Sequence, residues 1–329
     1  MTTTNAGIVL TAPHSIAIEA METPAPERDQ VLVRTRCSLI STGTELTLYG
    51  GEPGLGDAWR TLRDYPRSLG YSNVGIVEQV GSDVDPCWIG RRVHNHGYHQ
   101  VQALAPAAKL AEVPQDVADE HACFTTLAKV AMNGLRRAGA TWGEHIAIVG
   151  AGIVGQLAAR LCLHLGASRV TVIEPSAHRI NCLPQHTGLE TIDQPLGPAL
   201  GLNRQFDLVI EASGNPDVMQ GLPDLLRDQG RILLLSSPRG PSRFDFHDGC
   251  NRRSLTIIGA HSFSHPIDSR SGNPWTSARH ARLFLELLQQ GVLSVQPLIS
   301  RKVHYTNAAD AYRLLDERRE QTMAVLFSW

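Results

Sequence analysis

The chain has 329 residues, of which 42% are hydrophobic and 19% are charged, and its formal net charge is -2. This length favours two domains, because a single hydrophobic core stops growing near about 250 residues. The composition excludes a disordered chain, and the lack of any long lysine or arginine run excludes a broad surface for nucleic acid. We therefore expect a globular protein whose partner is a small-molecule substrate and not a nucleic acid.

The N-terminal segment and the cysteines indicate where the protein works. Residues 1–21 contain no basic region followed by an apolar core, and no stretch reaches the roughly 18 apolar residues that cross a bilayer. We expect a cytoplasmic protein that does not enter a membrane. The six cysteines include no C-x-x-C pair, which indicates reduced thiols rather than disulfides or a zinc ribbon.

Short strand patterns separated by turns run from Gly7 to roughly Pro106. Residues 30–35 alternate between apolar and polar side chains, and residues 74–80 form a strand pattern that ends at a Gly-Ser-Asp turn. Alternation with a period of two is typical of strands with one buried face. This part of the sequence predicts a small β-barrel or β-sandwich.

Helical patterning replaces these strands after Pro114. Residues 119–138 predict helix, and strands then alternate with helices over residues 146–258. This alternation is typical of βαβ units and a doubly wound parallel sheet. The middle of the chain therefore predicts an α/β domain.

The last part of the chain returns to shorter elements. Residues 274–291 predict an amphipathic helix, and the apolar run at residues 323–327 suits a buried strand that rejoins the first domain. We expect one domain at residues 1–118, completed by residues 265–329, and a second domain at residues 119–264.

A glycine turn after the predicted strand 145–149 is the strongest functional signal. The run Gly150-Ala151-Gly152-Ile153-Val154-Gly155 precedes a helical pattern over residues 156–165. In a dinucleotide-binding turn, the first glycine permits the bend, the second lets the backbone approach the pyrophosphate, and the third lets the helix pack on the strand. The N–H groups of Ile153 and Val154 would meet the phosphates. The alternative is that these glycines are only structural turns.

Glu174 follows the next predicted strand, residues 169–173, and decides the expected cofactor. A carboxylate there accepts hydrogen bonds from the adenosine ribose and repels a 2′-phosphate, which favours NAD(H) over NADP(H). His178 and Arg179 weaken this preference, and we include Arg179 among the cofactor-binding residues. The alternative is that Glu174 is an ordinary surface carboxylate.

Two later strand patterns are predicted at residues 206–214 and 230–235. Because the carboxyl ends of parallel strands face the cofactor crevice, Ser213 and Gly214 are expected to line it.

The order of these features resembles the medium-chain dehydrogenase/reductase superfamily over essentially the whole chain. Residues 31–51 look like that family's loop bearing a zinc cysteine, residues 65–84 like its Gly-His-Glu segment, and residues 90–93 like its Gly-Asp-Arg-Val turn. The resemblance implies an α/β protein with a GroES-like catalytic domain and a Rossmann domain. It also implies an NAD(P)-dependent oxidoreductase and a homodimer that pairs through residues 255–260.

The zinc ligands of that family are not matched. Ser41 or Thr42 stands where the resemblance places a cysteine, Gly70-Tyr71-Ser72 replaces Gly-His-Glu, and Thr125 or Thr126 stands in the third position. Hydroxyl groups are poor zinc ligands, and the lobe with four cysteines for structural zinc is missing. We therefore expect no zinc and no other metal.

Within the superfamily, residues 39–45 and 69–75 look most like a zinc-lacking group that includes the bacteriochlorophyllide a dehydrogenase. Relatives that share these segments act on diverse hydroxylated molecules. The expected reaction is the interconversion of a secondary alcohol and a ketone by NAD, without zinc, on a polyhydroxylated or natural-product substrate.

Without a metal, hydride transfer still needs a group that exchanges the hydroxyl proton and stabilises the developing oxyanion. Tyr71 is the first candidate, because it replaces a ligand histidine in the resemblance. Thr44 stands where relatives begin a proton relay, and Glu45 follows it. Lys129, on the helix after the two threonines, would lower the pKa of Tyr71. The alternatives are core packing for Tyr71 and a solvated charge for Lys129.

His99, Ser41 and His261 are the expected substrate contacts. His261 follows the predicted strand 255–260, where substrate-contacting residues occur in relatives. A metal site at His94, His96 and His99 is the alternative, although a strand places only the first two on one face.

Two other functions are weighed against alcohol oxidation. Zinc-free relatives often reduce activated C=C bonds or quinones with NADPH, and these relatives usually lack an acid at the Glu174 position. The chain could also be a nucleotide-binding or redox-sensing protein without catalysis.

Overall fold

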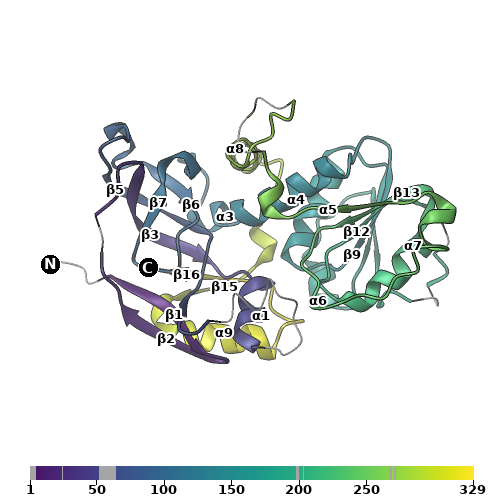
Figure 1. Ribbon diagram of the computed structural model, residues 1–329, viewed down its shortest axis with the longest axis horizontal. Coiled ribbons are helices and arrows are strands. Elements are labelled where there is room, and N and C mark those ends of the chain that lie inside the picture. Colours follow the sequence, from purple (N-terminus) through teal and green to yellow (C-terminus); the bar gives the residue numbers. More distant parts are fainter. Residues whose placement is uncertain are drawn as a thin grey trace. The chain divides into compact units, whose positions relative to one another are not determined.

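The computed structural model describes residues 5–23, 25–51, 64–197, 200–202, 204–266, 269 and 272–329. Within these ranges the chain forms two compact units (Figure 1). Unit 1 holds the described parts of residues 1–53, 57–126 and 266–329, and unit 2 holds those of residues 127–265. Helix α4 (Thr125–Arg137) begins at the end of unit 1 and continues into unit 2.

Two β-sheets form the framework of unit 1. Over its described residues, the larger sheet has seven strands in the order β15-β16-β3-β5-β6-β8, with β7 paired to β3, and the smaller sheet has the order β2-β1-β4. The strands are β1 (Ala6–Ala12), β2 (Ser15–Ala20), β3 (Gln30–Leu39), β4 (Arg67–Ser68), β5 (Asn73–Val80), β6 (Arg92–Asn95), β7 (Gln102–Pro106), β8 (Ala111–Glu112), β15 (Ile299–His304) and β16 (Ala324–Ser328). The helices are α1 (Thr44–Gly50), α3 (Asp119–Ala122), α8 (Ser277–Gln289) and α9 (Ala308–Glu317).

The C-terminal strand β16 lies inside the larger sheet, between the edge strand β15 and β3. It pairs with β3 in the antiparallel sense, with Leu326 opposite Leu39 and Phe327 opposite Ser38. Helix α9 contributes Tyr312 to the same hydrophobic core, where the ring is fully buried. The end of the chain therefore supplies part of the core around the loop that follows β3.

Unit 2 is a doubly wound parallel sheet with the strand order β11-β10-β9-β12-β13-β14. All neighbouring strands in it are parallel, and the order reverses between β9 and β12, which is where α/β sheets bind nucleotides. The strands are β9 (His145–Val149), β10 (Arg169–Ile173), β11 (Leu189–Ile192), β12 (Phe206–Glu211), β13 (Leu226–Leu234) and β14 (Thr256–Gly259). The helices that lie wholly in its described part are α5 (Ile153–His164), α6 (Ala177–Asn181) and α7 (Leu222–Leu225).

The predicted α/β class is confirmed, and the element boundaries differ in two informative places. Helix α5 starts at Ile153 rather than at residue 156, because the helix begins directly after its N-cap Gly152. Strand β13 starts at Leu226 rather than at residue 230, and the register shift between Phe206 and Leu208 accommodates the extra residues. A glycine inside a strand was thus read as the start of that strand.

In the described part of the chain, none of the helices has both the length and the apolar character required to cross a membrane.

Asp119 holds the start of helix α3 against the larger sheet. Its Oδ2 lies 2.7 Å from Arg36 Nε on β3, and its Oδ1 lies 3.1 Å from Arg92 Nη1 on β6. The carboxylate is 9% exposed and Arg92 is 19% exposed, so water screens their pair only weakly, whereas Arg36 is 55% exposed and its pair is screened more strongly.

Replacing Asp119 by alanine should lower the free energy of unfolding by about 2 kcal/mol, because two arginines lose a nearly buried partner. Asp310→Ala is the control, since Asp310 forms an exposed pair with Arg313 and its loss should change stability by less than about 0.5 kcal/mol. Urea unfolding followed by circular dichroism measures both. Equal effects of the two substitutions would contradict the role given to Asp119.

Candidate active site

The glycine turn of unit 2 joins β9 to α5. Gly150 has a φ of 98°, and a Cβ on it would lie 2.7 Å from the Ser213 Cα. A Cβ on Gly155 would lie 2.0 Å from the carbonyl oxygen of Gly150. The bend and the close helix therefore require the absence of a side chain at both positions.

Gly152 has a different reason to be glycine. A Cβ there would meet no protein atom within 4 Å, and the backbone φ of -65° suits any residue. The amides of Ile153 and Val154 lie in the first turn of α5, where no intrahelical bond can use them. Open space beside the start of a helix suits a phosphate group. The turn therefore fits the pyrophosphate of a dinucleotide.

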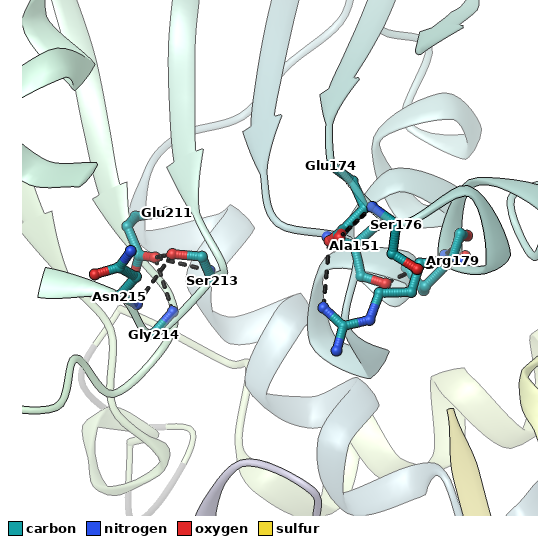
Figure 2. Close-up of polar contacts among 9 residues, drawn as sticks. Ala151, Glu174, Ser176, Arg179, Glu211, Ser213, Gly214 and Asn215 are labelled. Atoms are coloured by element: carbon teal, nitrogen blue, oxygen red, sulfur yellow. Dashed lines mark hydrogen bonds and ion pairs between the residues drawn. The ribbon is translucent and has the colours of Figure 1, made fainter. Parts of the chain in front are cut away.

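Glu174, at the end of β10, is buried and 3% exposed. Its Oε2 accepts a hydrogen bond from Ala151 N at 2.7 Å, and its Oε1 accepts one from Ser176 N at 3.0 Å (Figure 2). Arg179 Nη1 lies 3.4 Å from Oε2. Oε2 already accepts two hydrogen bonds, whereas Oε1 accepts one and can accept another from a ribose hydroxyl. The residue thus holds the glycine turn in addition to its predicted role.

Glu211, at the end of β12, was not singled out from the sequence. It is fully buried, and its Oε1 accepts hydrogen bonds from Ser213 N at 2.7 Å, Ser213 Oγ at 2.6 Å and Gly214 N at 3.0 Å (Figure 2). Ser236 Oγ donates to its Oε2. The predicted cofactor contacts Ser213 and Gly214 therefore form a turn organised by Glu211. An acid that ends an apolar strand just before Ser-Gly was the signal available in the sequence.

Three of the predicted residues of unit 1 come together through their hydroxyl groups. Tyr71 donates a hydrogen bond to Ser41 Oγ, and its phenol oxygen lies 3.3 Å from Thr44 Oγ1. Ser41 lies between β3 and α1, Thr44 is the first residue of α1, and Tyr71 lies just before β5. We refer to these three residues as the hydroxyl cluster.

The expectation that a cation lowers the pKa of Tyr71 is wrong. Burial raises the pKa of Tyr71 to about 12, and the negative charge of Glu45 raises it further, against the opposing effect of hydrogen bonds with Ser41 and Thr44. Desolvation disfavours the phenolate, so the phenol stays protonated at neutral pH. Tyr71 is therefore a hydrogen-bond donor and not a ready base.

Glu45 and His99 form a buried network that holds the cluster in place. Glu45 Oε1 accepts a hydrogen bond from Ser41 N at 2.8 Å, while Tyr312 Oη donates to Oε2. His99 Nε2 lies 3.2 Å from Oε2, and its Nδ1 lies 2.8 Å from Ser38 Oγ. Glu45 is 1% exposed and His99 is fully buried, and the catalytic role of Glu45 and the substrate-binding role of His99 stay predictions.

The two remaining candidates belong to unit 2. Lys129 is 4% exposed on α4, so the alternative of a solvated charge is wrong. His261 is exposed, accepts a hydrogen bond from Phe263 N at its Nδ1, and starts a short 3-10 helix. Their roles toward cofactor or substrate stay predictions.

The residues at the expected metal position do not fit zinc. The hydroxyl cluster offers three hydroxyl oxygens, whereas zinc sites in proteins use thiolates, imidazoles and carboxylates. Thr125 Oγ1 donates to the Ala122 carbonyl, and Thr126 Oγ1 donates to the Tyr71 carbonyl and lies 3.0 Å from His94 Nε2, so both hydroxyls already have protein partners. Over the described ranges, no three His, Cys, Asp or Glu residues gather in a way that could hold a metal ion. No step of the chemistry below passes through a metal.

Comparison with known proteins gives matches for both units. Residues 154–271 match the family model described as zinc-binding dehydrogenase. Over 349 aligned residues the chain is 28% identical to the D-guloside 3-dehydrogenase of Escherichia coli (strain K12), which covers 96% of this chain and 97% of that protein.

Solved structures show the same fold. An alcohol dehydrogenase from Escherichia coli CFT073, solved with NADH, has a TM-score of 0.82 and 19% identity, and the match covers 99% of this chain and 100% of that one. A dehydrogenase from Sinorhizobium meliloti 1021, bound to NADP, has a TM-score of 0.80 and 19% identity over 100% of both chains. The predicted combination of a GroES-like and a Rossmann domain is confirmed.

Gly152→Ala should separate cofactor binding from folding. The added methyl group meets no protein atom, so the free energy of unfolding should change by less than about 1 kcal/mol. The methyl group would occupy the space at the start of α5, and the Kd for NADH should rise at least about tenfold. Fluorescence titration with NADH and urea unfolding give the two values.

Gly155→Ala is the matched comparison. Its methyl group would collide with the Gly150 carbonyl, so this variant should lose more than about 2 kcal/mol of stability. A folded Gly152→Ala variant with unchanged NADH affinity would show that the space at α5 is not used.

Proposed function

We propose that this chain is a medium-chain dehydrogenase/reductase that interconverts a secondary alcohol and a ketone with NAD(H) and without zinc. The observation that carries the proposal is the hydroxyl cluster, in which Tyr71, Ser41 and Thr44 meet at the position where the family resemblance places a metal. Such a cluster can bind and orient the oxygen of an alcohol or ketone.

The proposed substrate is a polyhydroxylated or natural-product alcohol. The D-guloside 3-dehydrogenase is a relative along nearly the whole chain, and its name describes a sugar derivative. Hydroxyl groups of the protein exchange hydrogen bonds with hydroxyl groups of a sugar as donors and as acceptors. A sugar-like secondary alcohol therefore suits the chemistry of the cluster.

NAD(H) is the proposed cofactor because of Glu174. The buried carboxylate ends β10, the strand whose end carries the ribose-binding acid in Rossmann folds, and its negative charge disfavours a 2′-phosphate. The pyrophosphate would lie at the start of α5 beside Gly152. The bound nicotinamide supplies the hydride acceptor for alcohol oxidation.

The chain's own residues act on the oxygen atom of the substrate. The Tyr71 phenol is protonated at neutral pH and would turn its O–H from Ser41 to the substrate oxygen, stabilising the negative charge that this oxygen carries after its proton has left and before the hydride is transferred. Ser41 and Thr44 can each accept one proton while donating another, so they would relay the hydroxyl proton from the substrate oxygen to bulk water, which takes it up. In the reverse direction the same groups deliver the proton to the ketone oxygen.

A second candidate is the NADPH-dependent reduction of an activated C=C bond or a quinone. The position of Arg179, 3.4 Å from Glu174, favours it, because an arginine there can meet a 2′-phosphate. The hydrogen bonds of Glu174 favour NAD(H) instead. Two backbone amides hold its buried carboxylate in place, so the negative charge stays where a 2′-phosphate would have to bind.

The cofactor and the metal can be tested together on the purified protein. We expect NAD⁺-dependent oxidation within a panel of polyols and methyl glycosides, with kcat/KM at least about tenfold higher for NAD⁺ than for NADP⁺. Turnover should survive prolonged chelation, and metal analysis should find zinc far below one ion per chain.

Two results would decide against this proposal. A preference for NADPH together with turnover of quinones or enones would favour the second candidate. One zinc ion per chain, with activity lost on its removal, would contradict zinc independence.

Tyr71→Phe should lower kcat by about 100-fold, the usual effect of removing one donor to a developing oxyanion. The Kd for NADH should stay unchanged, because the cofactor contacts lie in unit 2. Tyr98→Phe, at a tyrosine that is 52% exposed, is the control and should leave kcat unchanged. Stopped-flow or steady-state turnover measures the rates.

The pH dependence of kcat is a second test of the role of Tyr71 as a hydrogen-bond donor. Because the protonated phenol is the working form and its pKa is raised to about 12, activity should not fall through deprotonation of Tyr71 until the pH approaches that value. A decrease in the wild type near pH about 8 that disappears in Tyr71→Phe would contradict the assigned pKa.

A further inference from the structure

A buried glutamate at the end of β10 and another at the end of β12 each accept hydrogen bonds from the backbone of a turn beside β9. Both strands are direct neighbours of β9, and each ends in a buried glutamate, Glu174 on β10 and Glu211 on β12 (Figure 2). Glu174 binds the glycine turn through the Ala151 amide. Glu211 binds the turn formed by residues 213–215, which contains the predicted cofactor contacts Ser213 and Gly214.

We propose that Glu211 is a positioning residue for the nicotinamide half of the cofactor, an inference that rests on the proposed function. In a doubly wound sheet of this strand order, the first three strands bind one mononucleotide half of the cofactor and the last three strands bind the other half. Glu174 ends a strand of the first group, where the adenosine ribose is recognised. Glu211 ends β12, the first strand of the second group.

The hydrogen bonds of Glu211 fix the turn from its buried side. One oxygen accepts from two backbone amides and a hydroxyl, all on Ser213 and Gly214, and the other oxygen accepts from the Ser236 hydroxyl after β13. The backbone carbonyl of Glu211 also accepts hydrogen bonds from Leu235 N and Ser236 N. One buried residue therefore ties together the ends of β12 and β13.

The turn held in this way packs directly on the dinucleotide turn. A Cβ on Gly150 would lie 2.7 Å from the Ser213 Cα, and the Ala212 amide donates to the Val149 carbonyl. Gly214 has a φ of 72°, and its carbonyl accepts a hydrogen bond from Arg239 N at 3.2 Å. Loss of the Glu211 contacts would free a backbone segment that touches the glycine turn on the β12 side.

Hydrogen bonds and charge can be separated at this position. Glutamine keeps the carbonyl oxygen that receives three of the bonds, and its amide can donate to Ser236 Oγ, since a hydroxyl also accepts. Alanine leaves all of these donors without their partner. A residue that acts through its hydrogen bonds should therefore be replaced well by glutamine and poorly by alanine.

The experiment measures binding of NADH and of 5′-AMP to the purified protein by calorimetry, with fluorescence as a second readout for NADH. We expect Glu211→Ala to raise the Kd for NADH at least about tenfold and to leave the Kd for 5′-AMP within about twofold, while Glu211→Gln stays within about threefold for both ligands. Glu190→Gln on β11, where an exposed pair with Arg169 is lost, is the control and should change neither value.

Ser213→Ala is the second variant, in case Glu211→Ala does not fold. It removes the hydroxyl that donates to Glu211 and accepts from Asn215 N, but keeps both backbone amides, so a smaller rise of about threefold for NADH alone is expected.

Three results would overturn the inference: unchanged NADH affinity in folded Glu211→Ala, equal weakening of NADH and 5′-AMP, or Glu211→Gln as weak as Glu211→Ala. Failure of the wild type to bind NADH would instead contradict the proposed function.

Discussion

The contact between Gly155 and the Gly150 carbonyl is the constraint on which unit 2 depends. A single methyl group on Gly155 would lie 2.0 Å from that oxygen, so the helix can start close to β9 only without a side chain there. Because α5 starts close to β9, its first backbone amides lie near the carboxyl ends of the two strands beside β9, which are β10 and β12. The neighbouring glutamates then fix the loops around the turn. The packing of the backbone therefore forms the phosphate-binding turn by itself, without a contribution from side chains that touch the ligand.

Buried carboxylates organise loops in both units. Glu45, Glu174 and Glu211 are each at most 3% exposed, and each accepts hydrogen bonds from backbone amides. Burying a carboxylate is unfavourable unless donors compensate for the lost water, so such a residue specifies the conformation of the segments that supply those donors. In unit 1 this device holds the Ser41 loop beneath the Tyr71 phenol.

In the proposed reaction, the hydroxyl cluster would give unit 1 a different chemistry from that of a metal site. A metal would stabilise an oxyanion by its charge, whereas the cluster offers neutral donors whose strength depends on fixed orientation. Orientation comes from the network through Glu45, His99 and Tyr312, which extends to Ser38 and the indole of Trp329 near the end of the chain. The C-terminal strand and helix of the chain are therefore part of the support for the site.

The sequence alone determined the fold class, the β-rich and doubly wound parts, and the glycine turn, because side-chain periodicity and glycine spacing are local properties. It also brought Tyr71, Ser41 and Thr44 into one hypothesis through the family resemblance. The sequence did not predict that Glu45 and His99 face inward, that the pKa of Tyr71 is raised, or that Glu211 holds the Ser213 turn. Burial and hydrogen-bond partners depend on residues far apart in the chain: Tyr312 is 267 residues from Glu45, and Ser236 is 25 residues from Glu211. Only the tertiary structure decides such distances. They determine whether an ionisable side chain can take part in the reaction or instead holds a neighbouring loop in place.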